Sequence, residues 1–152
     1  MSVLVDTNIL LRRAQVASEQ HRLVLDSLIE LVRADISLCL VPQVIYEFWV
    51  AATRPIDVNG LGVAVPQAEL MMKELLQDFV LLRDERGIFG NWQSLVVDYA
   101  IQGKRAHDAR LVAAMQKHGI SNVLTFNIAD FSRFPGIQVF TPSDVMAGRL
   151  PQ

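Results

Sequence analysis

Short apolar runs alternate along the chain with longer segments in which apolar and polar residues mix. The first run ends abruptly at the polar residues Asp6-Thr7-Asn8, which is typical of the point where a strand ends. Runs of this kind predict five short strands, over residues 2–5, 36–41, 80–82, 122–125 and 137–140.

The longer segments repeat apolar residues at the three- and four-residue spacing of an amphipathic helix. Pro42 and Pro66 suit the first turn of a helix, and Gly119 suits the position just after a last turn. The predicted helices cover residues 19–33, 42–54, 66–79, 92–102 and 106–118, with a short helix after a turn at 141–144. Segments 55–65, 84–91 and 127–135 contain glycine or proline and predict loops or turns.

Strands separated by helices predict an α/β fold with a central parallel sheet and helices on both of its faces. The length of 152 residues predicts one domain, residues 1–152, without internal repeats. In open parallel sheets, binding sites gather at the carboxyl ends of the strands. Polar residues that follow predicted strands are therefore the first candidates for function.

Composition narrows the classes of protein that the chain could represent. Hydrophobic residues make up 51% of the chain and charged residues 20%, which excludes a disordered protein and leaves apolar surface for a subunit interface. No apolar stretch reaches the roughly 18 residues that a membrane-spanning helix needs, and the N-terminus lacks a signal-peptide pattern. The single Cys39 agrees with a reducing compartment. We therefore expect a cytoplasmic protein without a membrane partner.

The net charge of −2 gives no overall attraction to nucleic acid. Binding of RNA would therefore depend on local basic patches. Basic residues near the acidic positions described next are the candidate phosphate contacts, although each alone is also typical of an ordinary solvated surface: Arg12, Arg13, Arg54, Lys104 and Arg133.

Four acidic residues are candidates for function, and three of them stand where a parallel sheet can bring them to one end. Asp6 directly follows a strand, Asp108 lies in the first turn of a helix, and Asp130 lies in the loop after another strand. Glu47 interrupts an otherwise apolar helix, where an ionised carboxylate is costly to bury without a partner. A bound cation would remove that cost. Taken singly, each aspartate could instead cap a helix or a turn, and Glu47 could be solvated.

Carboxylates gathered in one cleft repel one another, which raises their pKa values unless a metal neutralises them. Oxygen ligands without accompanying cysteine or histidine select Mg²⁺ or Mn²⁺ over Zn²⁺. Mg²⁺ keeps several waters, one of which can become the nucleophile of a hydrolysis. The acids therefore predict a Mg²⁺ or Mn²⁺ site with hydrolytic chemistry.

Four motifs resemble those of the PIN-domain ribonucleases, particularly the VapC-type toxins of bacterial toxin–antitoxin pairs. The opening motif stands here as VDTNIL at residues 5–10, and the helix-borne acid as Glu47 in VIYE. The third motif stands as HDARLVAA at residues 107–114 and the last as LTFNIADF at residues 124–131. The resemblance covers nearly the whole chain and implies a three-layer sandwich.

The resemblance also implies roles for these residues. Asp6, Glu47 and Asp108 would be metal ligands, direct or through water. The orienting residues would be Thr7, Asn8, Thr125 and Asn127. The fourth acidic place falls in some family members at the position of Asn127 and in others at that of Asp130. Asp130 is taken as the acid, with that assignment and the number of metal ions left open.

The implied activity is hydrolysis of RNA phosphodiester bonds by a metal-dependent endoribonuclease, the toxin of a type II toxin–antitoxin pair. The implied partners are an RNA substrate, a cognate antitoxin and a second copy of the chain. One alternative is a non-catalytic PIN-like module that binds RNA or protein, which the uncharged Asn127 favours. Another is a phosphatase with Asp6 as nucleophile, but its usual second acid two residues later is here Asn8.

Overall fold

The computed structural model describes residues 1–152 as an α/β fold built on one five-stranded parallel sheet. The sheet has the strand order β3-β2-β1-β4-β5. Its strands are β1 (Ser2–Val5), β2 (Ser37–Leu40), β3 (Val80–Leu81), β4 (Asn122–Leu124) and β5 (Gln138–Phe140). The helices are α1 (Thr7–Ala14), α2 (His21–Arg33), α3 (Pro42–Thr53), α4 (Val65–Asp78), α5 (Ile88–Asp98), α6 (Arg105–His118), α7 (Ile128–Phe131) and α8 (Pro142–Met146), with one 3-10 turn at Ile56–Val58.

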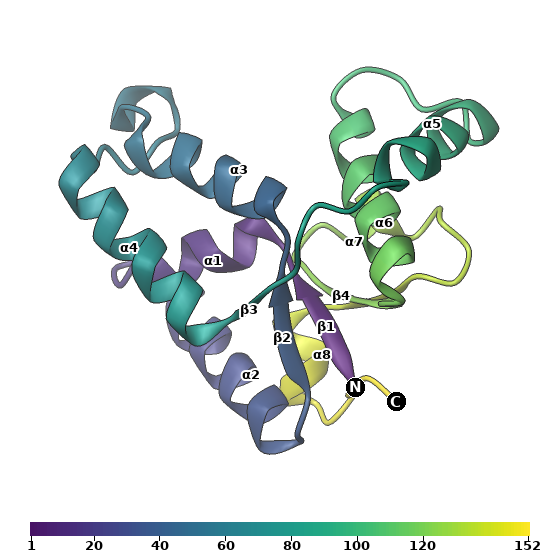
Figure 1. The fold of residues 1–152 in the computed structure, drawn as a ribbon. Helices are drawn as coiled ribbons and strands as arrows, with labels where there is room; N and C mark the ends of the chain where they lie inside the picture. Colours follow the sequence, from purple (N-terminus) through teal and green to yellow (C-terminus); the bar gives the residue numbers. More distant parts are fainter.

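The helices form a layer on each face of the sheet. Helices α1 to α4 cover one face and helices α5 to α7 the other (Figure 1). Parallel strands are joined by right-handed crossovers, so a chain that reverses its direction across the sheet also changes face. The chain moves outward from β1 through β2 to β3 and then returns to β4 on the far side of β1. The predicted parallel sheet with helices on both faces is confirmed.

The reversal makes the space between the carboxyl ends of β1 and β4 the switch point of the sheet, here called the crevice. Strand β1 pairs with β2 on one side and with β4 on the other, and Val5 lies in register with Leu124. Neighbouring crossovers leave these two strand ends on opposite faces, so no helix closes the space between them. The residues that follow, Asp6 and Thr125, therefore lie side by side at the place where α/β proteins usually bind ligands.

A single hydrophobic core explains why the sequence of the central strand, β1, is almost entirely apolar. Val3, Leu4 and Val5 of β1 are fully buried, because both faces of the strand carry helices. They belong to a cluster of 34 buried apolar residues that spans both layers. The rigid centre of the molecule thus ends directly at Asp6, which is itself 7% exposed.

Three local predictions were wrong. No separate helix was expected at residues 7–14, yet α1 begins directly after β1, because Asp6 accepts the N–H of Thr7 and caps the helix. Helix α5 begins at Ile88, inside the predicted turn 84–91, since Gly87 adopts a left-handed φ of 95° just before it. Asp130 lies in the four-residue helix α7 and not in a loop.

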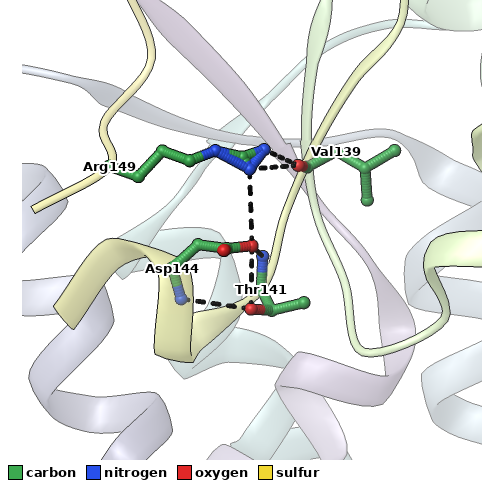
Figure 2. A network of polar contacts seen from close by, with 4 residues as sticks. All are labelled: Val139, Thr141, Asp144 and Arg149. Carbon is green, nitrogen blue, oxygen red and sulfur yellow. Dashed lines mark hydrogen bonds and ion pairs between the residues drawn. The ribbon is translucent and has the colours of Figure 1, made fainter. Parts of the chain in front are cut away.

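The C-terminal segment folds back beside the sheet, as expected from its turn and short helix. Thr141 and Asp144 form a capping box at the start of α8, and Arg149 pairs with Asp144 and donates to the carbonyl of Val139 (Figure 2). Helix α8 then packs against α2. None of the helices is long and apolar enough to cross a membrane.

Candidate active site

Asp6 lies in the crevice and is held by three hydrogen bonds. Its Oδ1 accepts the backbone N–H of Thr7 at 2.7 Å. Its Oδ2 accepts the hydroxyl of Thr125 at 2.7 Å and the amide of Asn8 at 3.1 Å. Because these donors come from both β1 and β4 strand ends, the carboxylate has a fixed orientation before any ligand arrives.

Asn8 and Thr125 join the two strand ends beneath Asp6. The amide of Asn8 also donates to Thr125 Oγ1 at 3.1 Å, and its Oδ1 accepts the N–H of Phe126 at 3.2 Å. Thr125 Oγ1 accepts the N–H of Asn127 at 3.0 Å. These contacts give Asn8 and Thr125 the position of orienting residues. The side chain of Asn127 is exposed, and only its backbone takes part.

Glu47 reaches the same crevice from α3. It is only partly buried, and both of its carboxylate oxygens accept hydrogen bonds. Oε2 accepts the hydroxyl of Thr7 at 2.9 Å, and Oε1 accepts the amide of Gln43 at 2.9 Å. Thr7 thus contacts both acids, because its backbone N–H donates to Asp6 and its hydroxyl donates to Glu47. These hydrogen bonds offset the free-energy cost of placing the ionised carboxylate of Glu47 in an otherwise apolar helix.

Asp108 and Asp130 approach from the other face of the sheet, on α6 and α7. Asp108 lies in the first turn of its helix, as predicted, and both side chains are partly buried. Neither carboxylate accepts a hydrogen bond from another residue of the chain. Helices α6 and α7 pack on each other, which brings these two acids together. Their lone pairs are therefore available to solvent or to a ligand.

The four acids interact electrostatically. The pKa of Asp6 is raised to about 6, mainly by burial and also by the charges of Glu47 and Asp130, while the hydrogen bonds from Thr125 and Thr7 lower it. The pKa of Asp108 is also raised to about 6, mainly by burial and then by the charges of Asp130, Asp6 and Glu47, while nearby His107 lowers it. The charges of Glu47 and Asp130 therefore act on both Asp6 and Asp108, so the four acids lie near the same end of the sheet. A single cation there would relieve the repulsion.

The donor set fits Mg²⁺ or Mn²⁺, since every acidic side chain offers hard oxygen and none of the four is in an ion pair. No three acidic, histidine or cysteine side chains lie close enough together to ligate one ion directly. An ion that keeps several waters needs only one or two direct carboxylates. The arrangement therefore suits a hydrated ion better than a closed protein cage.

The five basic residues predicted to contact phosphate differ in the partners of their side chains. Arg54 lines a cavity together with Glu47 and Tyr46. Lys104 and Arg133 are exposed and form no ion pair. Arg12 donates to Gln15 and Gln20, so its guanidinium is engaged along its own segment.

Arg13 is engaged more strongly than the other basic residues. It pairs with Asp78 at the end of α4, and its guanidinium lies over the ring of Phe79. Both contacts hold the side chain against α4 and the start of β3. The side chains of Lys104 and Arg133 form no hydrogen bond or ion pair, whereas Arg54 donates one N–H to the carbonyl of Asn59 and lies beside Glu47.

Two polar residues beside the site escaped the sequence analysis. Gln43 is 8% exposed and contacts Glu47, and Arg110 donates to Gln43 Oε1 at 3.4 Å. The only signal in the sequence is spacing: Gln43 stands four residues before Glu47 on one helix, where side chains meet. The contact with α6 depends on the tertiary fold and leaves no local pattern.

Comparison with known proteins gave matches among solved structures only. No family model matches the chain, and no curated protein sequence does. VapBC2 from Rickettsia felis, solved bound to a DNA fragment of its promoter, superposes with a TM-score of 0.68 over 93% of this chain and 98% of that chain, at 13% identity. The chain has the PIN-domain fold.

Two further matches are described as a toxin–antitoxin complex and as a toxin. A toxin–antitoxin complex from Klebsiella pneumoniae has a TM-score of 0.63 and 22% identity, over 92% of this chain and 97% of that chain. VapC20 from Mycobacterium tuberculosis, described as a toxin that cleaves the sarcin-ricin loop, has a TM-score of 0.63 and 15% identity, over 86% and 94%. At these identities the likeness establishes the fold, which is the one that the four motifs predicted.

Proposed function

We propose that this chain is a Mg²⁺- or Mn²⁺-dependent endoribonuclease that hydrolyses RNA phosphodiester bonds. The observation that carries the proposal is that Thr7 donates to both Asp6 and Glu47, and that the charges of Glu47 and Asp130 act on both Asp6 and Asp108. Burial and mutual repulsion raise the pKa values of two of them to about 6. A protein that keeps such a cluster loses stability by it, so the cluster needs a functional reason.

The four acids would contribute to the metal site in two different ways. Asp6 and Glu47 are oriented by their hydrogen bonds and are the expected primary ligands. Asp108 and Asp130 face them from α6 and α7 and would bind through water or directly. A bound divalent ion supplies a Lewis acid for the scissile phosphate and lowers the pKa of an attacking water. The hydroxyl of Thr125 donates to Asp6, which opposes the rise in the pKa of that carboxyl and helps to fix its orientation.

Basic side chains around the crevice support RNA as the substrate. Arg54 lies beside Glu47, and the free cations of Lys104 and Arg133 stand on the α6 and α7 side. Contacts of this kind bind phosphate without reading sequence. Binding of RNA should therefore weaken steeply as salt is added, although the net charge of the chain is −2.

We further propose that the protein is the toxin of a toxin–antitoxin pair. Structural matches in complex with antitoxins support an antitoxin as a partner. An apolar cavity of about 320 Å³ between α2, β2 and the end of α4 offers a place for an apolar peptide segment. Its lining includes Leu25, Ile29, Val32 and Phe79, two of which are strongly exposed.

A homodimer is the expected assembly. Phe89 and Val97 of α5 are 70% and 72% exposed, which is unusual for large apolar side chains on one helix. Burial of this face against a second copy would account for the high hydrophobic fraction of the chain. Light scattering on the purified protein tests this expectation directly.

The decisive experiment combines RNA cleavage with analysis of the product ends. Wild-type protein with Mg²⁺ should cut RNA and leave 5′-phosphate and 3′-hydroxyl ends, because water is the nucleophile. EDTA and the substitution Asp6→Ala should each abolish cleavage. Cyclic 2′,3′-phosphate ends formed in EDTA would refute metal-dependent hydrolysis. RNA binding without any cleavage, and without Mn²⁺ binding by calorimetry, would assign a non-catalytic module instead.

A further inference from the structure

A buried amide joins the two helices that carry Glu47 and Asp108. Gln43, in the first turn of α3, donates from Nε2 to Glu47 Oε1 at 2.9 Å and to the backbone carbonyl of His107 at 2.8 Å. His107 immediately precedes Asp108 in α6. One side chain thus contacts an acidic ligand candidate on α3 and the peptide next to another on α6.

The chemistry of its neighbours fixes the orientation of this amide. A carboxylate and a peptide carbonyl can only accept hydrogen bonds, so the nitrogen of Gln43 must face both. The amide oxygen then faces Arg110, whose Nη1 lies 3.4 Å away. Because Gln43 is 8% exposed, loss of any of these partners would leave a buried polar group unsatisfied.

Arg110 supports the amide without neutralising the acids. Its other nitrogen, Nη2, pairs with Asp84 at 3.0 Å, outside the acidic crevice. The guanidinium of Arg110 therefore forms its ion pair with Asp84 and donates one hydrogen bond to Gln43. A neutral donor at Glu47 orients the carboxylate and leaves its negative charge for a cation.

We propose that Gln43 is a positioning residue that sets the spacing between Glu47 and Asp108, and that the pair of Arg110 and Asp84 holds Gln43 in that role. The proposal rests on the proposed metal-dependent function. No other side chain forms hydrogen bonds both to α3 and to the first turn of α6.

The test is Mn²⁺ binding by calorimetry to wild type and to Gln43→Met, which keeps the size of the side chain but removes every hydrogen bond. The expected result is a dissociation constant about 10-fold higher or more, as for other residues that orient metal ligands. Gln93→Met, an exposed glutamine on α5, is the matched control and should bind like wild type. Cleavage by Gln43→Met should recover at high Mn²⁺, because the defect is in affinity.

Unchanged Mn²⁺ affinity in Gln43→Met would overturn the proposal while leaving the nuclease function intact. If wild type itself bound no Mn²⁺, both proposals would fall together. Should Gln43→Met not fold, Arg110→Met on the partly exposed face of α6 replaces it. A severalfold weaker affinity in Arg110→Met supports the proposal, and wild-type affinity contradicts it. Thermal melting in EDTA separates a purely structural defect, which would lower the melting temperature and leave the affinity unchanged.

Discussion

The two halves of the acidic crevice are built differently. On the β1 and α3 side, Asp6 and Glu47 accept five hydrogen bonds between them, from Thr7, Asn8, Gln43 and Thr125. On the α6 and α7 side, Asp108 and Asp130 accept none from the chain. The difference follows from position, because Asp6 stands at the end of the central strand and Glu47 on α3 lies within reach of Thr7 and Gln43, whereas Asp108 and Asp130 have no such donors around them on α6 and α7.

This difference suggests a division of labour. A carboxylate that is already oriented binds a cation without losing side-chain freedom, whereas a free carboxylate can adjust to the ion and the substrate. The first pair would thus fix where the ion sits, and the second pair would complete its shell. Substitutions on the two sides should therefore differ in kind as well as in size.

The largest effect is expected for Asp6→Asn. The substitution keeps the size of the side chain but removes the charge that faces the ion, and cleavage of RNA should fall by about 10³-fold or more. Single-turnover cleavage rates at saturating Mg²⁺ measure it. Asp26→Asn on the surface of α2 is the matched control and should cleave like wild type. Activity within tenfold of wild type would remove Asp6 from the site.

The affinity for a divalent metal ion should fall sharply as the pH is lowered. Asp6 and Asp108 both have pKa values raised to about 6, so each takes up a proton as the pH falls through that value. Affinity for Mn²⁺ should fall about 100-fold between pH about 7 and pH about 5, roughly tenfold for each acid. Calorimetric titration at several pH values gives the curve. Acids with ordinary pKa values would give almost no change over this range.

Thr125→Val tests the orientation of Asp6 while leaving every acid in place. The hydroxyl of Thr125 donates to Asp6 and accepts from Asn8 and Asn127, so its loss frees the carboxylate to rotate. The rate of cleavage should fall by about 10-fold to 100-fold, as for other residues that orient metal ligands. Thr53→Val, at the far end of α3, serves as the control. Full activity of Thr125→Val would mean that the hydrogen bonds are incidental.

Asp130 and Asn127 can be separated by one substitution each. Asp130 interacts with Asp6 and Asp108, whereas the Asn127 side chain is exposed. Asp130→Asn should lower cleavage by about 10-fold or more, and Asn127→Ala should change it less than about threefold. The opposite ranking would assign the fourth place to Asn127.

The smallest effect is on stability without metal. An acid whose pKa is raised on folding stabilises the folded state below its unfolded value of 3.8, and loses that contribution as the pH rises through about 6. Asp108→Asn should therefore stabilise the metal-free protein at neutral pH by about 1 kcal/mol, and little at pH about 4.

Thermal melting in EDTA measures this change. Asp6→Asn should gain less than Asp108→Asn, because it also weakens three hydrogen bonds to Asp6. Equal increases in stability for Asp6→Asn and Asp108→Asn would contradict the proposed difference between the hydrogen-bonded acid and the free one.

Much of this site was accessible from sequence because its residues follow strands. Asp6 and Thr125 could be placed together once β1 and β4 were recognised as buried parallel strands. Helix α1 was missed because Asp6-Thr7-Asn8 ends a strand and begins a helix at once, and the same letters signal both events. The role of Gln43 could not be predicted, because its second partner is a backbone carbonyl 64 residues away.

The central claim is that the four acids hold a divalent cation in the crevice between β1 and β4. Anomalous diffraction from crystals soaked in MnCl₂ at neutral pH tests it most directly. The account predicts one strong peak bounded by Asp6 and at least one of Glu47, Asp108 and Asp130. The claim would be contradicted if Mn²⁺ bound elsewhere in the crystal and left the crevice empty. It would also be contradicted if the peak lay next to none of these carboxylates.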